Sequence, residues 1–309
     1  MFAYLIRRIF FGAFVLLGTS LITFAIAFMV PADPAVAMAG AKADPHTLAT
    51  IRHQLHLDEP LYVQYGEYVD RALHGDLGRS YIRRESVTRL ILSRFPATAL
   101  LAISAMALSL MLGIAMGLVA TAYRGSFIDN TQLVASLAMV SMPVFWLGTM
   151  LLIAASAFTR SIPLGGLAGW KSLILPTITL ALGSAGYYSR ILHTNLSDAM
   201  AQEYVRTAIG KGLSRSRAMV KHAMANALLP LITLAGLDLA GLLSGVVLTE
   251  TVFNWPGIGR LAYEAIFSLD IPLIMGTVLF SAFLIVIANL VVDLMYAYFD
   301  PRIRLEEMG

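Results

Sequence analysis

A cationic segment between Arg190 and His222 is the part of this sequence whose residue types are best suited to contact a partner. Its six basic side chains outnumber the two acidic ones, Asp198 and Glu203. The basic residues are Arg190, Arg206, Lys211, Arg215, Arg217 and Lys221. A loop of this kind either docks onto another protein or sets the topology of a membrane protein, and the spacing alone leaves both open.

The middle of this segment has the pattern of a docking helix. Gly212 has no Cβ atom, so the backbone there can closely approach a partner. Leu213, Arg217 and Val220 recur at helical spacing and are expected on one face. A short helix with an apolar ridge and basic flanks is suited to insert into a cleft on another protein.

Residues for bond-making chemistry are missing from the sequence. There is no G-x-x-x-x-G-K-[ST] phosphate loop, so we do not expect the chain to hydrolyse ATP. No Ser-His-Asp or H-E-x-x-H arrangement is evident, and zero cysteines exclude disulfides, thiol catalysis and Cys-ligated zinc or iron–sulfur sites. We expect a protein that is not an enzyme.

Asp238 is an ionisable residue near the middle of an apolar run, where such a group is costly and usually faces a cavity or a partner. One hypothesis is that it lines a pathway and favours a cationic group on a substrate. The alternative is a carboxylate hydrogen-bonded to a neighbouring helix. Asp293, near the end of the last apolar run, is expected to pair with Arg302 or Arg304.

Composition identifies the elements that must position these residues. The 309 residues are 58% hydrophobic and 13% charged, with a mean hydropathy of +0.75, which indicates a polytopic membrane protein. About 20 apolar residues cross a bilayer. Six runs are predicted to do so: 9–30, 95–123, 130–159, 172–189, 223–249 and 271–292.

The Lys/Arg bias of the short loops sets the predicted orientation. The basic 190–222 connection is expected in the cytoplasm. The 250–270 connection holds Arg260 against Glu250, Glu264 and Asp270 and is expected outside. Both termini are therefore cytoplasmic. Residues 31–94 are basic yet placed outside, which is acceptable because long loops translocate largely regardless of charge.

The N-terminus admits a second interpretation. Arg7-Arg8 and the following apolar run superficially resemble a twin-arginine export signal, with Ala35-Val36-Ala37 as a cleavage site. A signal h-region is about 7–15 residues long, which is shorter than the uncharged run here, so an uncleaved first helix is favoured.

Residues 31–94 are expected to fold as helices outside the bilayer. Asp44 is placed as an N-cap with Pro45 at the first helical position, and 61–73 is predicted as a second helix. His46, His53, His56 and His74 could suggest a metal site, but ordinary surface histidines are the favoured interpretation.

Two further features bear on a pathway. Pro143 and Trp146 fall inside the third run, where a proline kinks a membrane helix and either lines a cavity or packs as an ordinary bend. Asn254-Trp255-Pro256-Gly257 has the residues of a turn. Trp255 either lines an entrance or anchors the chain at the membrane interface.

Four blocks in order resemble the permease subunits of dipeptide, oligopeptide and nickel ABC importers of bacteria. The first comprises Leu57–Tyr65, His74–Ser80 and Arg94–Thr98. The second is S-M-P-V-F-W-L-G at Ser141–Gly148. The third is E-Y-V-R-T-A-I-G-K-G-L-S at Glu203–Ser214 and continues to Pro230. The fourth is E-T-V-F-N-W-P-G-I-G-R-L at Glu250–Leu261, closing at Val292–Arg304.

The resemblance implies a type I ABC importer permease fold. It is all-α, with six transmembrane helices and a helical extracytoplasmic insertion after the first. The division is 1–30 for the N-terminal end and first helix, 31–94 for the insertion, and 95–309 for a five-helix core with a coupling loop at 190–226. The protein would lie in the bacterial inner membrane, with no cofactor of its own, because ATP and Mg are bound by partner ATPase subunits.

The implied partners are a second homologous permease, two ATPase subunits of the same or different chains, an extracytoplasmic substrate-binding protein and the lipid bilayer, with no nucleic acid. The residues implied to couple to the ATPase are Glu203, Arg206, Ala208, Lys211, Gly212, Leu213, Arg217 and Val220. Pathway-lining candidates are Pro143, Trp146, Asp238 and Trp255. Arg206-Thr207-Ala208 replaces the Glu-Ala-Ala of the general ABC pattern, and Met224-Ala225 replaces its Leu-Pro, as in the peptide and nickel branch.

The expected cargo is a di- or oligopeptide. Nickel, a metal chelate, glutathione or haem are alternatives in the same family. A stand-alone secondary transporter is disfavoured, since no inverted repeat or paired intramembrane ionisable residues are evident.

Overall fold

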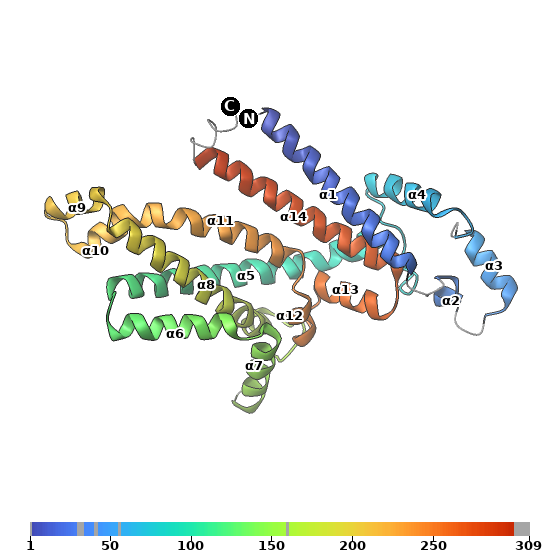
Figure 1. The fold of residues 1–309 in the computed structure, drawn as a ribbon. Helices are drawn as coiled ribbons and strands as arrows, with labels where there is room; N and C mark the ends of the chain where they lie inside the picture. Colours follow the sequence, from blue (N-terminus) through green and yellow to red (C-terminus); the bar gives the residue numbers. More distant parts are fainter. Residues whose placement is uncertain (1, 30–33, 40–42, 55–56, 159–160, 300–309) are drawn as a thin grey trace. The chain divides into compact units, whose positions relative to one another are not determined.

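The computed structural model describes residues 2–29, 34–39, 43–54, 57–158 and 161–299. Within these ranges the regular structure is helical, apart from one isolated bridge between Arg79 and Ser86 (Figure 1). The chain forms two compact units. Unit 1 comprises Met1–Thr98, Gly241–Thr251 and Pro256–Val291, and unit 2 comprises Ala99–Ala240, Val252–Trp255 and Val292–Gly309.

Unit 1 contains the first and last long helices and the short helices expected outside the membrane. Its elements are α1 (Phe2–Met29), α2 (Pro34–Ala39), α3 (Pro45–Gln54), α4 (Leu61–Leu73), the start of α5 (Val87–Ala122), α12 (Val247–Val252), α13 (Ile258–Phe267) and most of α14 (Ile271–Phe299). In Figure 1, α1 and α14 lie side by side. Gly12 permits this, because a Cβ atom there would lie 2.7 Å from Cγ1 of Val286.

The α4 helix packs on α1 through aromatic residues. The hydroxyls of Ser20 and Tyr65 are 2.9 Å apart, and the rings of Phe24 and Tyr65 meet edge to face at 5.3 Å. Phe24 and Tyr68 join Ile271 in one buried cluster. The helix predicted at 61–73 is confirmed, with Tyr68 as its buried residue.

Unit 2 is built around α8 (Ile174–Met200), which has fourteen buried residues. Around it are the rest of α5, α6 (Phe127–Ser141), α7 (Val144–Phe158), η1 (Trp170–Leu173), α9 (Glu203–Gly210), α10 (Arg215–Ala218), the π-helical η2 (Met219–Ala223) and α11 (Met224–Leu243) up to Ala240. Glycines allow close packing on α8: a Cβ at Gly113 would lie 2.7 Å from that of Tyr188.

Four described helices are long and apolar enough to cross a membrane: Ile6–Ala27, Val87–Ala122, Arg215–Leu243 and Ile271–Asp293. The bent pair α6 and α7 makes five if it is one span. This count is consistent with six predicted spans if α8 is the sixth. Polar residues along α8 lower its hydropathy, and its extensive burial explains why it need not be apolar all round.

Four predicted spans differ from the structure. The run 95–123 begins earlier, at Val87, and the run 172–189 continues as α8 to Met200, so Arg190 lies in this helix and not in a loop. The run 130–159 is two helices that meet at 99°, because the chain is extended at Met142 (φ −75°, ψ 125°) immediately before Pro143. The run 223–249 is shifted: helical structure begins at Arg215 and α11 ends at Leu243. Gly245 stops it with a φ of +112°, a conformation that favours glycine.

Other local predictions hold. Asp44 caps α3 as expected, because its Oδ1 accepts the backbone N–H groups of His46 and Thr47 at 3.0 Å. The first and last apolar runs are continuous helices. The division into 1–30, 31–94 and 95–309 stays a prediction. The two units group residues that contact one another and do not tell which residues lie in the membrane. Arg302, Arg304 and His56 lie outside the described residues, so the pairing expected for Asp293 does too.

Candidate functional site

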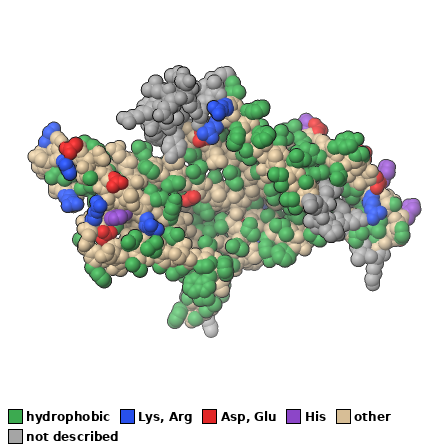
Figure 2. Space-filling model, viewed as in Figure 1, with side chains coloured by type: hydrophobic (Ala, Val, Ile, Leu, Met, Phe, Trp, Pro, Cys, Tyr) green, Lys and Arg blue, Asp and Glu red, His purple; other side chains and the backbone are tan. Residues whose placement is uncertain are grey.

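The cationic segment folds as a helical elbow in unit 2, which we call the basic elbow (residues 203–221). It consists of α9, a turn at Lys211–Ser214, then α10 and the first residues of η2. Gly212 makes the turn with a φ of +95°, and open space surrounds the position of its missing Cβ. Figure 2 shows Lys and Arg side chains gathered over α9 and α10.

The residues of the basic elbow divide into an inner and an outer set. Val205, Ala208 and Ala218 are buried, and Leu213 packs against the apolar cluster that holds α8 and α11 together. The single apolar ridge predicted from Leu213, Arg217 and Val220 is wrong, because Leu213 lies in the turn and faces inward. Ala208 also faces inward.

The outer set retains the character expected of a docking surface. Glu203, Arg206, Lys211, Gly212 and Arg217 are exposed. Exposed apolar side chains lie among them: Tyr204, Ile209 and Val220, the last 58% exposed. Glu203 pairs with Arg206 at 3.1 Å. The other basic residues of the elbow, which are Lys211, Arg215, Arg217 and Lys221, keep the surface positive.

Asp238 lies on α11 and has a partner on α8. The hydroxyl of Tyr188 donates to its Oδ2 at 2.6 Å. Tyr188 is fully buried and Asp238 is exposed. The alternative role predicted for Asp238, a hydrogen bond to a neighbouring helix, is therefore present. This bond involves one of the two carboxylate oxygens, and the side chain stays exposed. Because α11 ends at Leu243, Asp238 lies toward the end of its helix and not near its middle.

The other pathway candidates fall in different environments of unit 2. Pro143 and Trp146 are exposed where α6 ends and α7 begins. Trp255 is fully buried within its own subunit, so its side chain contacts neither an open entrance nor the membrane surface in this structure. Its neighbour Phe253 is held by a hydrogen bond from the N–H of Gly166 to its carbonyl at 2.9 Å.

A buried carboxylate that sequence reasoning missed lies in unit 1. Glu250 has no exposed surface. It accepts the Thr98 hydroxyl at 2.8 Å and the N–H of Arg260 at 2.8 Å, and Thr98 in turn accepts the N–H of Ile258 at 2.8 Å. These bonds place a carboxylate at the N-terminus of α13, where the helix dipole favours negative charge.

Two glycines make room for this carboxylate. A Cβ atom at Gly257 would overlap the Glu250 carboxylate, and one at Gly259 would lie 3.0 Å from its Oε2. Burial nevertheless raises the pKa of the Glu250 carboxyl above its usual value, although the hydrogen bonds oppose this. The available sequence signal was a lone glutamate a few residues before two closely spaced glycines.

The remaining acidic residues of the 250–270 connection are also paired within unit 1. Asp270 is buried and accepts the hydroxyl of Ser80 and the N–H of Tyr81, the latter at 3.1 Å. Glu264 pairs with Arg83 at 2.5 Å and with Arg260 at 2.8 Å. The acidic residues of this connection therefore fasten it to the segment before α5.

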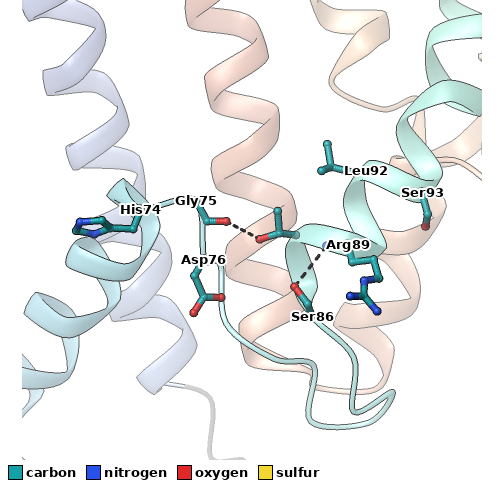
Figure 3. A pocket seen from close by; sticks show the side chains of 8 residues that line it. His74, Gly75, Asp76, Ser86, Arg89, Leu92 and Ser93 are labelled. Atoms are coloured by element: carbon teal, nitrogen blue, oxygen red, sulfur yellow. Dashed lines mark hydrogen bonds between the residues drawn. The ribbon is translucent and has the colours of Figure 1, made fainter.

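An open pocket of about 660 Å³ lies near the start of α5 in unit 1. Figure 3 shows its lining, in which the carbonyl of Gly75 accepts the Thr88 hydroxyl at 2.9 Å. Most lining residues are exposed, so the pocket is a surface hollow without buried polar groups aimed into it. His74 lines it and lies 2.8 Å from the carbonyl of Asp70 through Nδ1. The described residues contain no cluster of three or more His, Asp or Glu side chains that could hold a metal.

The helical architecture, with several helices long and apolar enough to cross a membrane, defines the class as a polytopic membrane protein. Comparison with protein families identifies it further. Residues 109–305 match the binding-protein-dependent transport system inner membrane component family, and residues 1–102 match the N-terminal component of the same membrane proteins. The chain belongs to this family, and it is a permease subunit of an ABC importer.

Relatives match over almost the whole chain. One relative is a protein of Brucella abortus (strain 2308) that is named as a peptide transport system permease protein. It is 38% identical over 98% of this chain and 99% of its own length. The glutathione transport system permease protein GsiC of Escherichia coli O6:H1 is 36% identical over 98% and 99%.

Solved structures show the same fold. An amino acid ABC transporter crystallised with histidines aligns with a TM-score of 0.53 and 16% identity, covering 70% of this chain and 94% of that one. The inward-facing methionine transporter MetNI aligns with a TM-score of 0.53 and 16% identity, covering 68% and 95%. The all-α importer permease fold predicted from the sequence is confirmed.

Proposed function

We propose that this permease forms half of the translocation pathway for di- or oligopeptides delivered by an extracytoplasmic binding protein. The observation that carries the proposal is the full-length similarity to permeases named for peptide and for glutathione transport. Glutathione is itself a peptide derivative and is the second candidate cargo. The chain supplies no ATP site, so the energy comes from partner ATPase subunits.

The basic elbow is the proposed contact with the ATPase. Its exposed apolar side chains Ile209 and Val220 would enter a cleft, while Arg206, Lys211 and Arg217 would flank it. Ala208 and Leu213 act from within by fixing the elbow to α8 and α11. Gly212 sets the turn. Movement of the ATPase would then pass into unit 2 through this packed base.

The proposed orientation places the basic elbow and both termini in the cytoplasm of the cell. The α3 and α4 helices and the 250–270 connection then lie outside, where the binding protein delivers cargo. A second homologous permease completes the pathway, with Pro143 and Trp146 among the exposed residues available to line it or to contact that subunit.

The test is co-purification of tagged protein from detergent-solubilised membranes. The test variant carries Arg217→Glu and Val220→Asp, which change an exposed basic and an exposed apolar residue three positions apart. The matched control carries Arg124→Glu and Phe127→Asp, with the same chemistry, spacing, exposure and predicted side. We expect the wild type and the control to retain ATPase subunits and the test variant to lose at least about nine-tenths of them.

Retention of the ATPase by the test variant would refute the proposed elbow contact. Wild type that purifies without any ATPase and transports without ATP would instead indicate a secondary transporter. Uptake of radiolabelled dialanine by the reconstituted complex, with and without excess glutathione, separates the two candidate cargoes.

A further inference from the structure

The Asp238 carboxylate is exposed, and no basic side chain among the described residues pairs with it. It is the one charged side chain in the sequence of α11. Among the residues that the structure describes, its partner is the neutral hydroxyl of Tyr188, and no Lys, Arg or His pairs with it. A carboxylate in a membrane helix that is exposed on its own subunit would be costly against lipid. Its open face must therefore meet water in the pathway or another polar group.

The contacts of α11 with α14 set the depth of Asp238. The carbonyl of Ser244, just past the end of α11, accepts the hydroxyl of Ser281 at 2.7 Å, and a Cβ atom at Gly236 would lie 2.7 Å from Cγ2 of Val292. Since α14 runs from outside to the cytoplasm in the proposed orientation, Asp238 lies in the inner half of the bilayer, and a substrate from outside would meet it late on the route.

The neighbouring helix fixes the carboxylate. Tyr188 is fully buried, and its hydroxyl contacts both Oδ2 of Asp238 at 2.6 Å and the sulfur of Met106 at 3.7 Å. The hydrogen bond holds one oxygen of Asp238, and the side chain is otherwise exposed. The exposed ring of Tyr187 lies 6.1 Å from that of Tyr188 and offers an aromatic face, which also attracts cations.

We propose that Asp238, positioned by Tyr188, binds the free α-amino group of a peptide during its passage through the permease. A primary ammonium is a compact cation with three donors, and it complements one oriented carboxylate with an exposed oxygen. Asp238 is the binding residue and Tyr188 is a positioning residue. This inference rests on the proposed peptide cargo.

The natural absence of cysteine permits a direct test in the assembled complex. Leu237→Cys puts a single thiol in this chain beside Asp238, at a position 41% exposed. The thiol is reacted with methanethiosulfonate reagents that carry either a trimethylammonium or a sulfonate head, and labelling of this chain is followed by mass. Each labelling rate is divided by the rate of the same reagent with a free thiol in solution. Because a carboxylate attracts the trimethylammonium and repels the sulfonate, we expect this corrected rate to be at least about tenfold higher for the cationic reagent.

The variants locate the source of that preference. With Asp238→Asn the ratio should fall to within about twofold of unity, and with Tyr188→Phe it should take an intermediate value. Asp198→Asn, an exposed acid-to-amide change elsewhere in unit 2, should leave the ratio unchanged. Uptake of dialanine per complex should fall at least tenfold in Asp238→Asn, with Asp238→Glu recovering part of it.

Three results would overturn the proposal: a thiol at 237 that neither reagent reaches, a ratio that Asp238→Asn does not change, or loss of the second permease from the Asp238→Asn complex. The last would show that Asp238 pairs with that subunit. If the wild type imports no dialanine, the peptide cargo is refuted, while the labelling ratio still reports whether Asp238 attracts cations.

Discussion

Asp238 and Glu250 are two carboxylates only twelve positions apart that the fold treats in opposite ways. Glu250 is fully buried in unit 1 and accepts hydrogen bonds from Thr98 and Arg260. Asp238 is exposed in unit 2 and accepts one hydrogen bond, from Tyr188. A carboxylate whose acceptors are taken up by its own chain is structural, because it has nothing left to offer a ligand. The exposed one with an open oxygen is the better candidate for function.

The largest effect should come from removing the enclosed carboxylate. Glu250→Ala leaves the Thr98 hydroxyl and the Arg260 N–H without their acceptor in a buried place, which costs about 1–3 kcal/mol for each donor. We expect little folded protein in the membrane. The protein that is extracted in detergent should lose its monodisperse peak in size-exclusion chromatography at a lower temperature than wild type. Glu250→Gln keeps one acceptor and should be milder. A Glu250→Ala protein as stable as wild type would remove the contrast.

The space around the same carboxylate gives the next largest effect. Gly257→Ala should destabilise by about 1–3 kcal/mol, because the new methyl group overlaps Glu250 and forces it to move. Gly66→Ala in α4 is the matched control: it meets no atom within 4 Å and should raise stability by up to about 1 kcal/mol through helix propensity. Equal heat resistance of the two variants would show that the carboxylate is not tightly enclosed.

The pH dependence of stability also distinguishes the buried carboxylate from the exposed one. Burial raises the pKa of Glu250 in the folded state above its usual value of 4.5. The folded state then binds the proton more tightly, so the contribution to stability is complete below about pH 4.5 and is lost as pH rises through the folded pKa. The midpoint of the heat-induced loss of the monodisperse peak should fall in wild type, relative to Glu250→Gln, as the pH rises from about 4.5 through the pKa of Glu250 in the folded state. If the midpoints of the two proteins change in parallel with pH, burial does not raise the pKa of Glu250.

The smallest effect on stability is expected at the exposed carboxylate. In Asp238→Asn the amide oxygen can still accept the Tyr188 hydroxyl, so the change should stay below about 1 kcal/mol. The same heating assay checks this. A loss as large as that of Glu250→Ala would mean that Asp238 is structural as well.

Local patterns predicted much of the fold. The Asp44-Pro45 start of α3 follows from capping, the end of α4 follows from the glycines after it, and α1 and α14 follow from apolar length. Pro143 predicts a bend, but the 99° turn between α6 and α7 depends on how both helices pack against α8. The spacing predicts Leu213 on a helix face, whereas the turn at Gly212 directs it into the cluster between α8 and α11.

The site residues show where reasoning from sequence ends. Asp238 could be singled out because a charge in an apolar run is a local signal. The role of Glu250 could not, because its partner Thr98 is 152 positions away and nothing in either segment specifies the pairing. Tyr188 gave no signal for the same reason, since a tyrosine in a helix acquires its role only when Asp238 of another helix reaches it.

The most direct test of the contrast is uptake of radiolabelled dialanine, divided by the amount of assembled complex, for wild type, Asp238→Asn and Glu250→Gln. We predict that Asp238→Asn assembles normally and transports at least tenfold less per complex. Glu250→Gln should yield less complex, but each complex that forms should transport at nearly the wild-type rate. Wild-type transport per complex in Asp238→Asn would contradict the account and leave Asp238 without a role in the pathway.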